Sequence, residues 1–119
     1  MEAREKGRFG EEQAAKYLRR RGYRLVESNY SCRAGEIDLI VRNRQYIVFV
    51  EVKLRKSADF AAAREFVTAA KQRRIVTTAS LWLSQHECEL QPRFDVVEIY
   101  APEGERGRVE IRHLEDAFS

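Results

Sequence analysis

The chain has 119 residues, of which 44% are hydrophobic and 34% are charged, and its formal net charge is +3. This length fits one globular domain over residues 1–119, with a core large enough to fold without a disulfide or a metal. The longest apolar runs are too short to span a bilayer and the first residues contain no apolar signal-peptide core, so we expect a cytoplasmic protein. Cys32 and Cys88 do not have the spacing of a metal site and are expected to be free thiols.

Helical and strand-like segments alternate along the chain. We expect a first helix from Glu2 or Lys6 to Arg21, ended by Gly22, and then a strand from Tyr23 to Tyr30. The later elements are expected at residues 36–42 and 46–54 (a hairpin), 64–85 (a helix), and 93–101 and 108–112 (two strands). This order predicts a mixed α/β sandwich in which helices pack on a central sheet. Residues 46–52 are apolar on both faces, which predicts that their strand is central.

Two carboxylates interrupt the apolar hairpin. Side chains alternate between the faces of a strand, so Glu51 and Lys53 share a face. A turn about Arg44 and Gln45 then places Asp38 opposite Glu51, with Cβ atoms about 5 Å apart. A register shift of one residue would separate the two acids, so this prediction depends on the register.

A cation would stabilise such a pair of acids. At about 5 Å and an effective dielectric near 20, the two charges repel by roughly 3 kcal/mol, and one acid should hold a proton at neutral pH. Oxygen ligands without nearby histidine or cysteine favour Mg²⁺ or Mn²⁺, which commonly bridge one or two carboxylates to a phosphate substrate. Lys53 would then reach the metal-bound water or the phosphate. The alternative is a solvated ion-pair cluster, because an acid-x-lysine triplet is common by chance.

The first helix supplies a third acid. Glu11, Ala14 and Leu18 follow the helical repeat, so Glu11 lies on the face expected to be buried. Glu12 is about 100° away around the helix and is expected at the surface. The sequence therefore predicts that Glu11 approaches Asp38 and Glu51.

Basic residues gather in four short segments, which are Arg19–Arg21, Arg42 with Arg44, Lys53–Lys56 and Lys71–Arg74. Such clusters suit phosphate backbones. For any one cluster a solvated surface is the better interpretation, and nucleic acid is favoured only if several clusters lie on one face with the acids. The side chains expected to contact nucleic acid are Arg8, Arg55, Lys56, Lys71, Arg73 and Arg74.

Three further polar residues keep alternative roles. Glu36 is either an additional ligand or an edge residue paired with an arginine. Gln72 either forms a hydrogen bond with the site or caps the apolar stripe of its helix. Asp95 is expected to be a structural ion-pair partner of Arg93 or a turn residue. His113 stands alone in the sequence and is expected to be structural.

Five segments carry a resemblance to a known family: GRFGEEQAAKYLRRRGY, GEIDLI, FVEVKLR, KQRRI and RFDVVEIY. They resemble the YraN family of small bacterial proteins, from about Gly7 to the HLEDAF ending. That family in turn resembles archaeal Holliday junction resolvases of the restriction-endonuclease-like PD-(D/E)XK superfamily. The resemblance implies a three-layer sandwich with a mixed sheet of about five strands and helices on both faces. It also implies a Mg²⁺-dependent phosphodiesterase site and a homodimer as one expected assembly.

The same resemblance implies roles for individual residues. Asp38 and Glu51 would bind the metal, together with the carbonyl of Val52. Lys53 would orient or activate water and stabilise the transition state, and Glu11 matches the glutamate of the resolvases' first helix. The proline of the motif is absent, because Ile37 precedes the aspartate.

Three classes of function follow. The first is a Mg²⁺-dependent DNA endonuclease, with branched or structured DNA as the expected substrate. The second is a non-catalytic DNA-binding or recruitment module on a nuclease fold. The third is a protein-interaction domain with a vestigial acid cluster, which is disfavoured because paired buried acids destabilise a fold unless something binds them.

Overall fold

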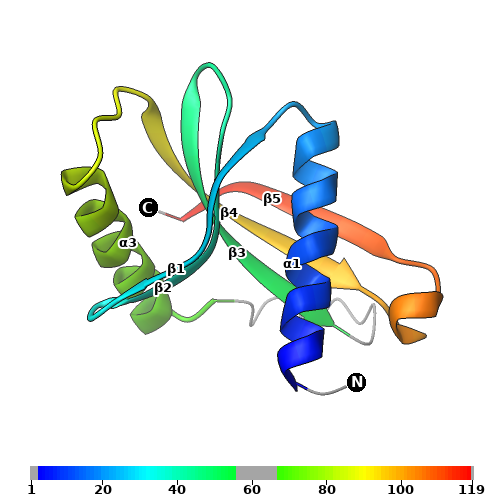
Figure 1. Cartoon of the computed structure of the whole chain (residues 1–119). Helices are drawn as coiled ribbons and strands as arrows, with labels where there is room; N and C mark the ends of the chain where they lie inside the picture. Colours follow the sequence, from blue (N-terminus) through cyan, green and yellow to red (C-terminus); the bar gives the residue numbers. More distant parts are fainter. Residues whose placement is uncertain (1–2, 56–66, 119) are drawn as a thin grey trace.

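The computed structural model describes residues 3–55 and 67–118, which form one mixed sheet with a helix on each face (Figure 1). The elements are α1 (Ala3–Arg20), β1 (Arg24–Cys32), β2 (Gly35–Arg42), β3 (Tyr46–Arg55), α3 (Ala69–Ser84), β4 (Gln91–Tyr100), the short 3₁₀ helix η1 (Gly104–Arg106) and β5 (Glu110–Phe118). The strands lie in chain order across the sheet. All neighbours are antiparallel except β3 and β4, which are parallel. The predicted three-layer α/β sandwich and the central position of β3 are confirmed.

Two apolar cores hold the layers together. One core lies between α1 and the sheet, where Ala14 and Leu18 pack against Val48 and Val50. The other lies between α3 and the sheet and includes Ile40, Phe49, Ile75 and Trp82. Successive residues of β3 alternate between these two cores, so the strand is apolar on both faces, as its sequence predicts.

Helix α1 ends at a glycine, as expected. Gly22 has a φ of +93°, in the left-handed region that favours glycine. Its N–H donates to the carbonyl of Arg19, and the N–H of Tyr23 donates to the carbonyl of Leu18. These bonds occupy carbonyls that would otherwise lack a partner at the helix end, and they set the direction in which β1 begins.

The second helix begins later than the sequence predicts. Of the predicted start, residues 64–66 lie outside the described residues, but Val67 and Thr68 are not helical. Thr68 has an extended backbone, and its hydroxyl accepts a hydrogen bond from the N–H of Lys71. This is an N-cap, so the helix begins at Ala69.

Strand β5 is longer than the predicted residues 108–112, because the chain from His113 to Phe118 also pairs with β4. The pairing is irregular between Phe94 and Val96, and Asp116 has a φ of +51°. An irregular strand of this kind does not show a clean apolar–polar alternation, which explains why the prediction stopped early.

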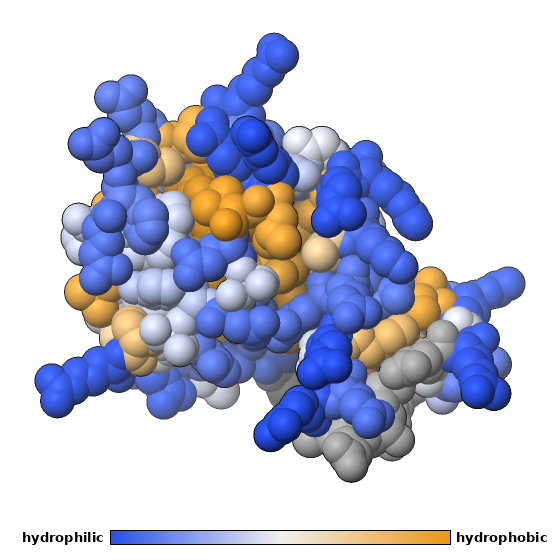
Figure 2. Space-filling view, viewed as in Figure 1, coloured by the Kyte–Doolittle hydropathy of each residue, from blue (hydrophilic) through white to orange (hydrophobic). Residues whose placement is uncertain are grey.

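Charged groups lie mostly outside the cores. Figure 2 shows hydrophilic side chains projecting around one face of the molecule, with an apolar area inside that rim. Within residues 3–55 and 67–118, the buried charged residues are Glu51, Arg93, Asp95 and Glu98. Burial of a charge is unfavourable unless the charge is paired, so each of these residues is expected to have a partner or a ligand. No helix within the described ranges is long and apolar enough to cross a membrane.

Candidate active site

The hairpin register brings Asp38 and Glu51 together. Ladder pairs run from Arg42 with Ile47 to Leu39 with Val50, as the predicted turn requires. Asp38 and Glu51 come directly after the last of these pairs. The predicted register is therefore the observed one.

Asp38 lies where β2 and β3 part. Its Oδ2 accepts a hydrogen bond of 2.8 Å from the main-chain N–H of Val52. Ile37 and Ile40, on either side of it, both face the α3 core, so the regular alternation of β2 breaks at this point. Asp38 consequently reaches a pocket on the α1 side and is not confined to the α3 face that simple alternation predicts.

The pocket beside Asp38 has a volume of about 200 Å³. It is lined by Lys6, Gly7, Gly10, Glu11, Asp38, Val52 and Leu54. Glu11 is half-buried there, and the side-chain amide of Asn29 donates to its Oε1 at 3.0 Å. Glu12 is exposed, so the two adjacent glutamates differ as predicted. Nothing in the sequence indicates a role for Asn29, because a polar residue on a strand shows no pattern of its own.

Asp38 does not behave as an ordinary carboxylate. Burial and the neighbouring charge of Glu51 raise its pKa to about 7, and Glu11 adds to this effect. The hydrogen bond from Val52 lowers the pKa and only partly compensates. The repulsion between the two acids that the sequence predicts thus contributes to the raised pKa of Asp38.

Two lysines surround the carboxylate of Glu51, which is 6% exposed. The Nζ of Lys71 lies 2.6 Å from its Oε1, and the Nζ of Lys53 lies 3.4 Å from the same atom. Burial lowers the pKa of Lys53, and the adjacent ammonium of Lys71 lowers it further. Burial also acts to lower the pKa of Lys71, but its contacts with Glu51 and Lys53 and the charges of Glu51 and Asp38 together outweigh burial, and the pKa is raised. Lys71 therefore belongs to the cluster itself, besides being a predicted phosphate contact.

Each acid keeps one oxygen available. Among the described residues, no hydrogen bond reaches Oδ1 of Asp38 or Oε2 of Glu51. No three carboxylate, imidazole or thiol groups in residues 3–55 and 67–118 are grouped so that they could hold a metal ion. The donors expected for an ion here are these two carboxylates, to which the family resemblance adds the carbonyl of Val52. Two such oxygens with a main-chain carbonyl fit Mg²⁺, which commonly keeps several waters and takes few protein ligands.

The remaining predicted contacts are dispersed. Arg55 lies on β3 and its Nε donates to the buried Glu98 at 3.0 Å. Arg73 and Arg74 are exposed on α3, and Arg8 is exposed on α1. Lys56 lies outside the described residues.

The alternatives for Glu36 and Gln72 are narrowed by their surroundings. Glu36 is exposed and forms no ion pair within the described part of the chain. The side-chain amide of Gln72 donates to the carbonyl of Val67, just before α3, and not to an acid of the site.

Asp95 belongs to a separate, structural network, which confirms its ion pair with Arg93. Arg93 donates to both oxygens of Asp95 at 2.9 and 2.8 Å, and also to the hydroxyl of Tyr23. His113 donates to Asp95 at 2.7 Å, and the N–H of Asp116 donates at 3.0 Å. Burial acts to raise the pKa of Asp95, but these bonds outweigh it and lower the pKa. His113, expected to be structural, is a partner in this network; no local spacing in the sequence indicates that.

Comparison with known proteins agrees with the sequence motifs. Residues 10–99 match the profile of the uncharacterised protein family UPF0102. A UPF0102 protein of Symbiobacterium thermophilum is 45% identical over 113 residues, covering 94% of each chain. One of Caldanaerobacter subterraneus is 41% identical over 113 residues, covering 94% of this chain and 93% of its own. The chain belongs to the UPF0102 family, which is the YraN family that its motifs resemble.

Proposed function

We propose that the protein is a Mg²⁺-dependent endonuclease that hydrolyses phosphodiester bonds in DNA, with branched or structured DNA as its substrate class. The observation that carries this proposal is the arrangement of Asp38 and Glu51. They meet where two strands part, each keeps one oxygen without a hydrogen bond from a described residue, and Lys53 lies beside Glu51. An acid pair that raises a pKa to about 7 is unfavourable in the metal-free protein and becomes favourable around a divalent cation.

In this proposal each residue of the chain has a distinct role. Asp38, Glu51 and the carbonyl of Val52 hold the ion, which neutralises phosphate charge and lowers the pKa of a bound water. Lys53, whose pKa is lowered, orients the attacking water and stabilises charge on the phosphate. Glu11 lines the pocket beside Asp38, where it contributes a third negative charge.

The basic side chains that remain exposed hold the DNA backbone. Arg73 and Arg74 on α3 and Arg8 on α1 are suited to this role because they are exposed. Contacts to phosphate position a duplex without reading its sequence, so little sequence preference is expected. A cytoplasmic location is part of the proposal, since Cys32 and Cys88 are both free thiols.

The test is cleavage of junction, flap, single-stranded and duplex DNA in Mg²⁺ or Mn²⁺. Asp38→Asn and Glu51→Gln should each reduce cleavage at least a hundredfold, because each removes a ligand charge. Glu12→Gln is the matched control, since Glu12 is exposed and neighbours Glu11. Wild-type rates in both site variants would refute the assignment of this site.

One observation favours a second candidate, a non-catalytic DNA-binding module. Lys71 already pairs with Glu51 at 2.6 Å, so part of the acid charge is balanced without a metal. A module of this kind would bind DNA with strong salt dependence and would cleave none of the substrates in either metal.

A further inference from the structure

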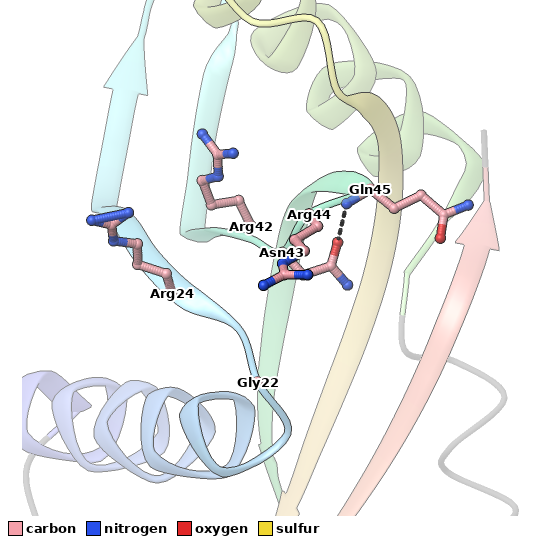
Figure 3. Close-up of a pocket in the computed structure, with 6 residues that line it drawn as sticks. All are labelled: Gly22, Arg24, Arg42, Asn43, Arg44 and Gln45. Carbon is pink, nitrogen blue, oxygen red and sulfur yellow. Dashed lines mark hydrogen bonds between the residues drawn. The ribbon is translucent and has the colours of Figure 1, made fainter.

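A second basic feature lies away from the acid pair. We call it the arginine cleft, an open depression of about 500 Å³ between the start of β1 and the turn from β2 to β3 (Figure 3). It is lined by Gly22, Arg24, Arg42, Asn43, Arg44 and Gln45. None of these residues belongs to the proposed catalytic site or to the DNA contacts proposed above.

The charges in the arginine cleft are uncompensated. Arg24 and Arg42 are direct partners across β1 and β2, and like charges in such positions repel one another. Arg24, Arg42 and Arg44 are exposed, and none of them forms an ion pair within the described ranges. Of the residues that the structure describes, no acidic one lines the cleft. An anionic ligand would remove a repulsion that the fold otherwise retains.

The backbone around the arginine cleft is fixed in advance. Oδ1 of Asn43 accepts hydrogen bonds from the N–H of Gln45 and of Tyr46, at 2.9 and 2.7 Å. The turn is also tied to β4, because the N–H of Gln91 donates to the carbonyl of Gln45. On the other side, Gly22 ends α1 and directs the chain into Arg24. Less backbone ordering is therefore needed when a ligand binds, although the arginine side chains still lose freedom.

We infer that the arginine cleft binds the phosphodiester backbone of nucleic acid by charge, without reading bases. Its lining contains no aromatic or aliphatic side chain on which a base could stack. Arginine is suited to phosphate because its guanidinium presents several donors in one plane. Free phosphate or diphosphate offers the same chemistry, and the experiment below separates these two sources.

The position of the arginine cleft relative to Asp38 suggests how the cleft would serve the proposed nuclease. This step alone rests on the proposed function. Arg42 is four residues along β2 from Asp38, which corresponds to about 13 Å of strand. Successive phosphates of one DNA strand advance about 3.4 Å along the helix axis, so this spans roughly four nucleotides. The cleft thus provides a second anchor for the backbone, away from the bond that is cut.

The test compares two triple variants with the same change in charge. Arg24→Gln, Arg42→Gln and Arg44→Gln together remove the charge of the cleft. Arg4→Gln, Arg106→Gln and Arg108→Gln remove three exposed charges elsewhere. Both triples also carry Asp38→Asn, and binding to a fluorescent 20-bp duplex is measured in EDTA, so that cleavage does not enter the result.

The cleft triple should bind the duplex at least tenfold more weakly than the control triple at 0.1 M salt. The slope of log affinity against log salt should fall by about 2–3, or roughly one per lost phosphate contact. Its melting temperature should be unchanged or slightly higher, since the repulsion between Arg24 and Arg42 is gone, so unfolding would not explain the loss.

Equal duplex affinities for the two triples would overturn the inference while leaving the nuclease proposal standing. Competition by millimolar diphosphate in the wild type, with equal duplex affinities, would identify a small-anion site and also overturn it. Cleft-dependent binding by a wild-type protein that never cleaves DNA would refute the nuclease and keep the inference.

Discussion

Two aspartates in the same sheet, Asp95, which is buried, and Asp38, which is half-buried, have opposite environments. Asp95 on β4 accepts hydrogen bonds from Arg93, His113 and the N–H of Asp116, and its pKa is lowered. Asp38 on β2 accepts one main-chain hydrogen bond, from Val52, and burial together with the charge of Glu51 raises its pKa to about 7. The hydrogen-bonding capacity of Asp95 is filled by residues of the fold, whereas the charge of Asp38 is not balanced in this way and is available to a ligand. The difference separates a structural ion pair from a binding site.

The largest expected change in stability follows replacement of Asp95. Asp95→Ala leaves Arg93 buried without its carboxylate partner, and breaking a buried pair in this way typically costs about 3–5 kcal/mol of unfolding free energy. Urea unfolding followed by circular dichroism measures the change. Cleavage by the remaining folded protein should persist, because Asp95 lies outside the candidate site. A stability within 0.5 kcal/mol of the wild type, on the usual scale for surface substitutions, would show that the network is not structural.

Replacement of Asp38 should change stability in the opposite direction to replacement of Asp95. A group whose pKa is raised on folding stabilises the fold at low pH, and that stability is lost as pH rises through the folded pKa. For Asp38 the loss falls between about pH 4 and pH 7. Asp38→Asn has no such loss and can still accept from Val52. At pH 8 without metal it should be more stable than the wild type, by roughly 1 kcal/mol after allowing for partial exposure.

Thermal melts at pH 4.5 and pH 8 in EDTA measure this difference, which should be smaller at the lower pH. Added Mg²⁺ should raise the melting temperature of the wild type and leave Asp38→Asn unchanged, because a ligand stabilises only the state that binds it. A variant less stable than the wild type at pH 8 would show that Asp38 supports the fold in the way that Asp95 does.

The sequence predicts the register that brings Asp38 and Glu51 together, but not which face of the sheet Asp38 reaches. The apolar hairpin and its turn are sufficient to place Asp38 next to Glu51, because a shift of one residue would expose an apolar face. The break in alternation beside Asp38 depends on where two strands part, which is a property of the whole sheet. Likewise, the approach of Lys71 to Glu51 depends on how α3 lies against β3. His113 meets Asp95 only because β5 continues past its predicted end.

The smallest expected effect concerns Lys71, which fills the place of a cation beside Glu51. Its ammonium lies 2.6 Å from the carboxylate and is partly exposed, with a relative side-chain accessibility of 38%. A divalent ion that binds Glu51 must compete with this pair. Partly exposed ion pairs contribute about 0.2–1 kcal/mol, so Lys71→Gln should bind Mg²⁺ or Mn²⁺ up to roughly fivefold more tightly.

Isothermal titration calorimetry with Mn²⁺ measures that affinity directly and needs no substrate. Arg73→Gln is the matched control, because Arg73 is exposed two residues further along α3 and its replacement changes the net charge equally. If the control tightens metal binding as much as Lys71→Gln, the effect is one of overall charge and the pairing is incidental. If Lys71→Gln alone binds the ion more tightly but DNA more weakly, Lys71 serves both ligands. Lys71 would then neutralise Glu51 when no ion is bound and contact phosphate when the ion is bound. Asp95 has no such exchangeable partner, because its hydrogen bonds are made by residues of the fold.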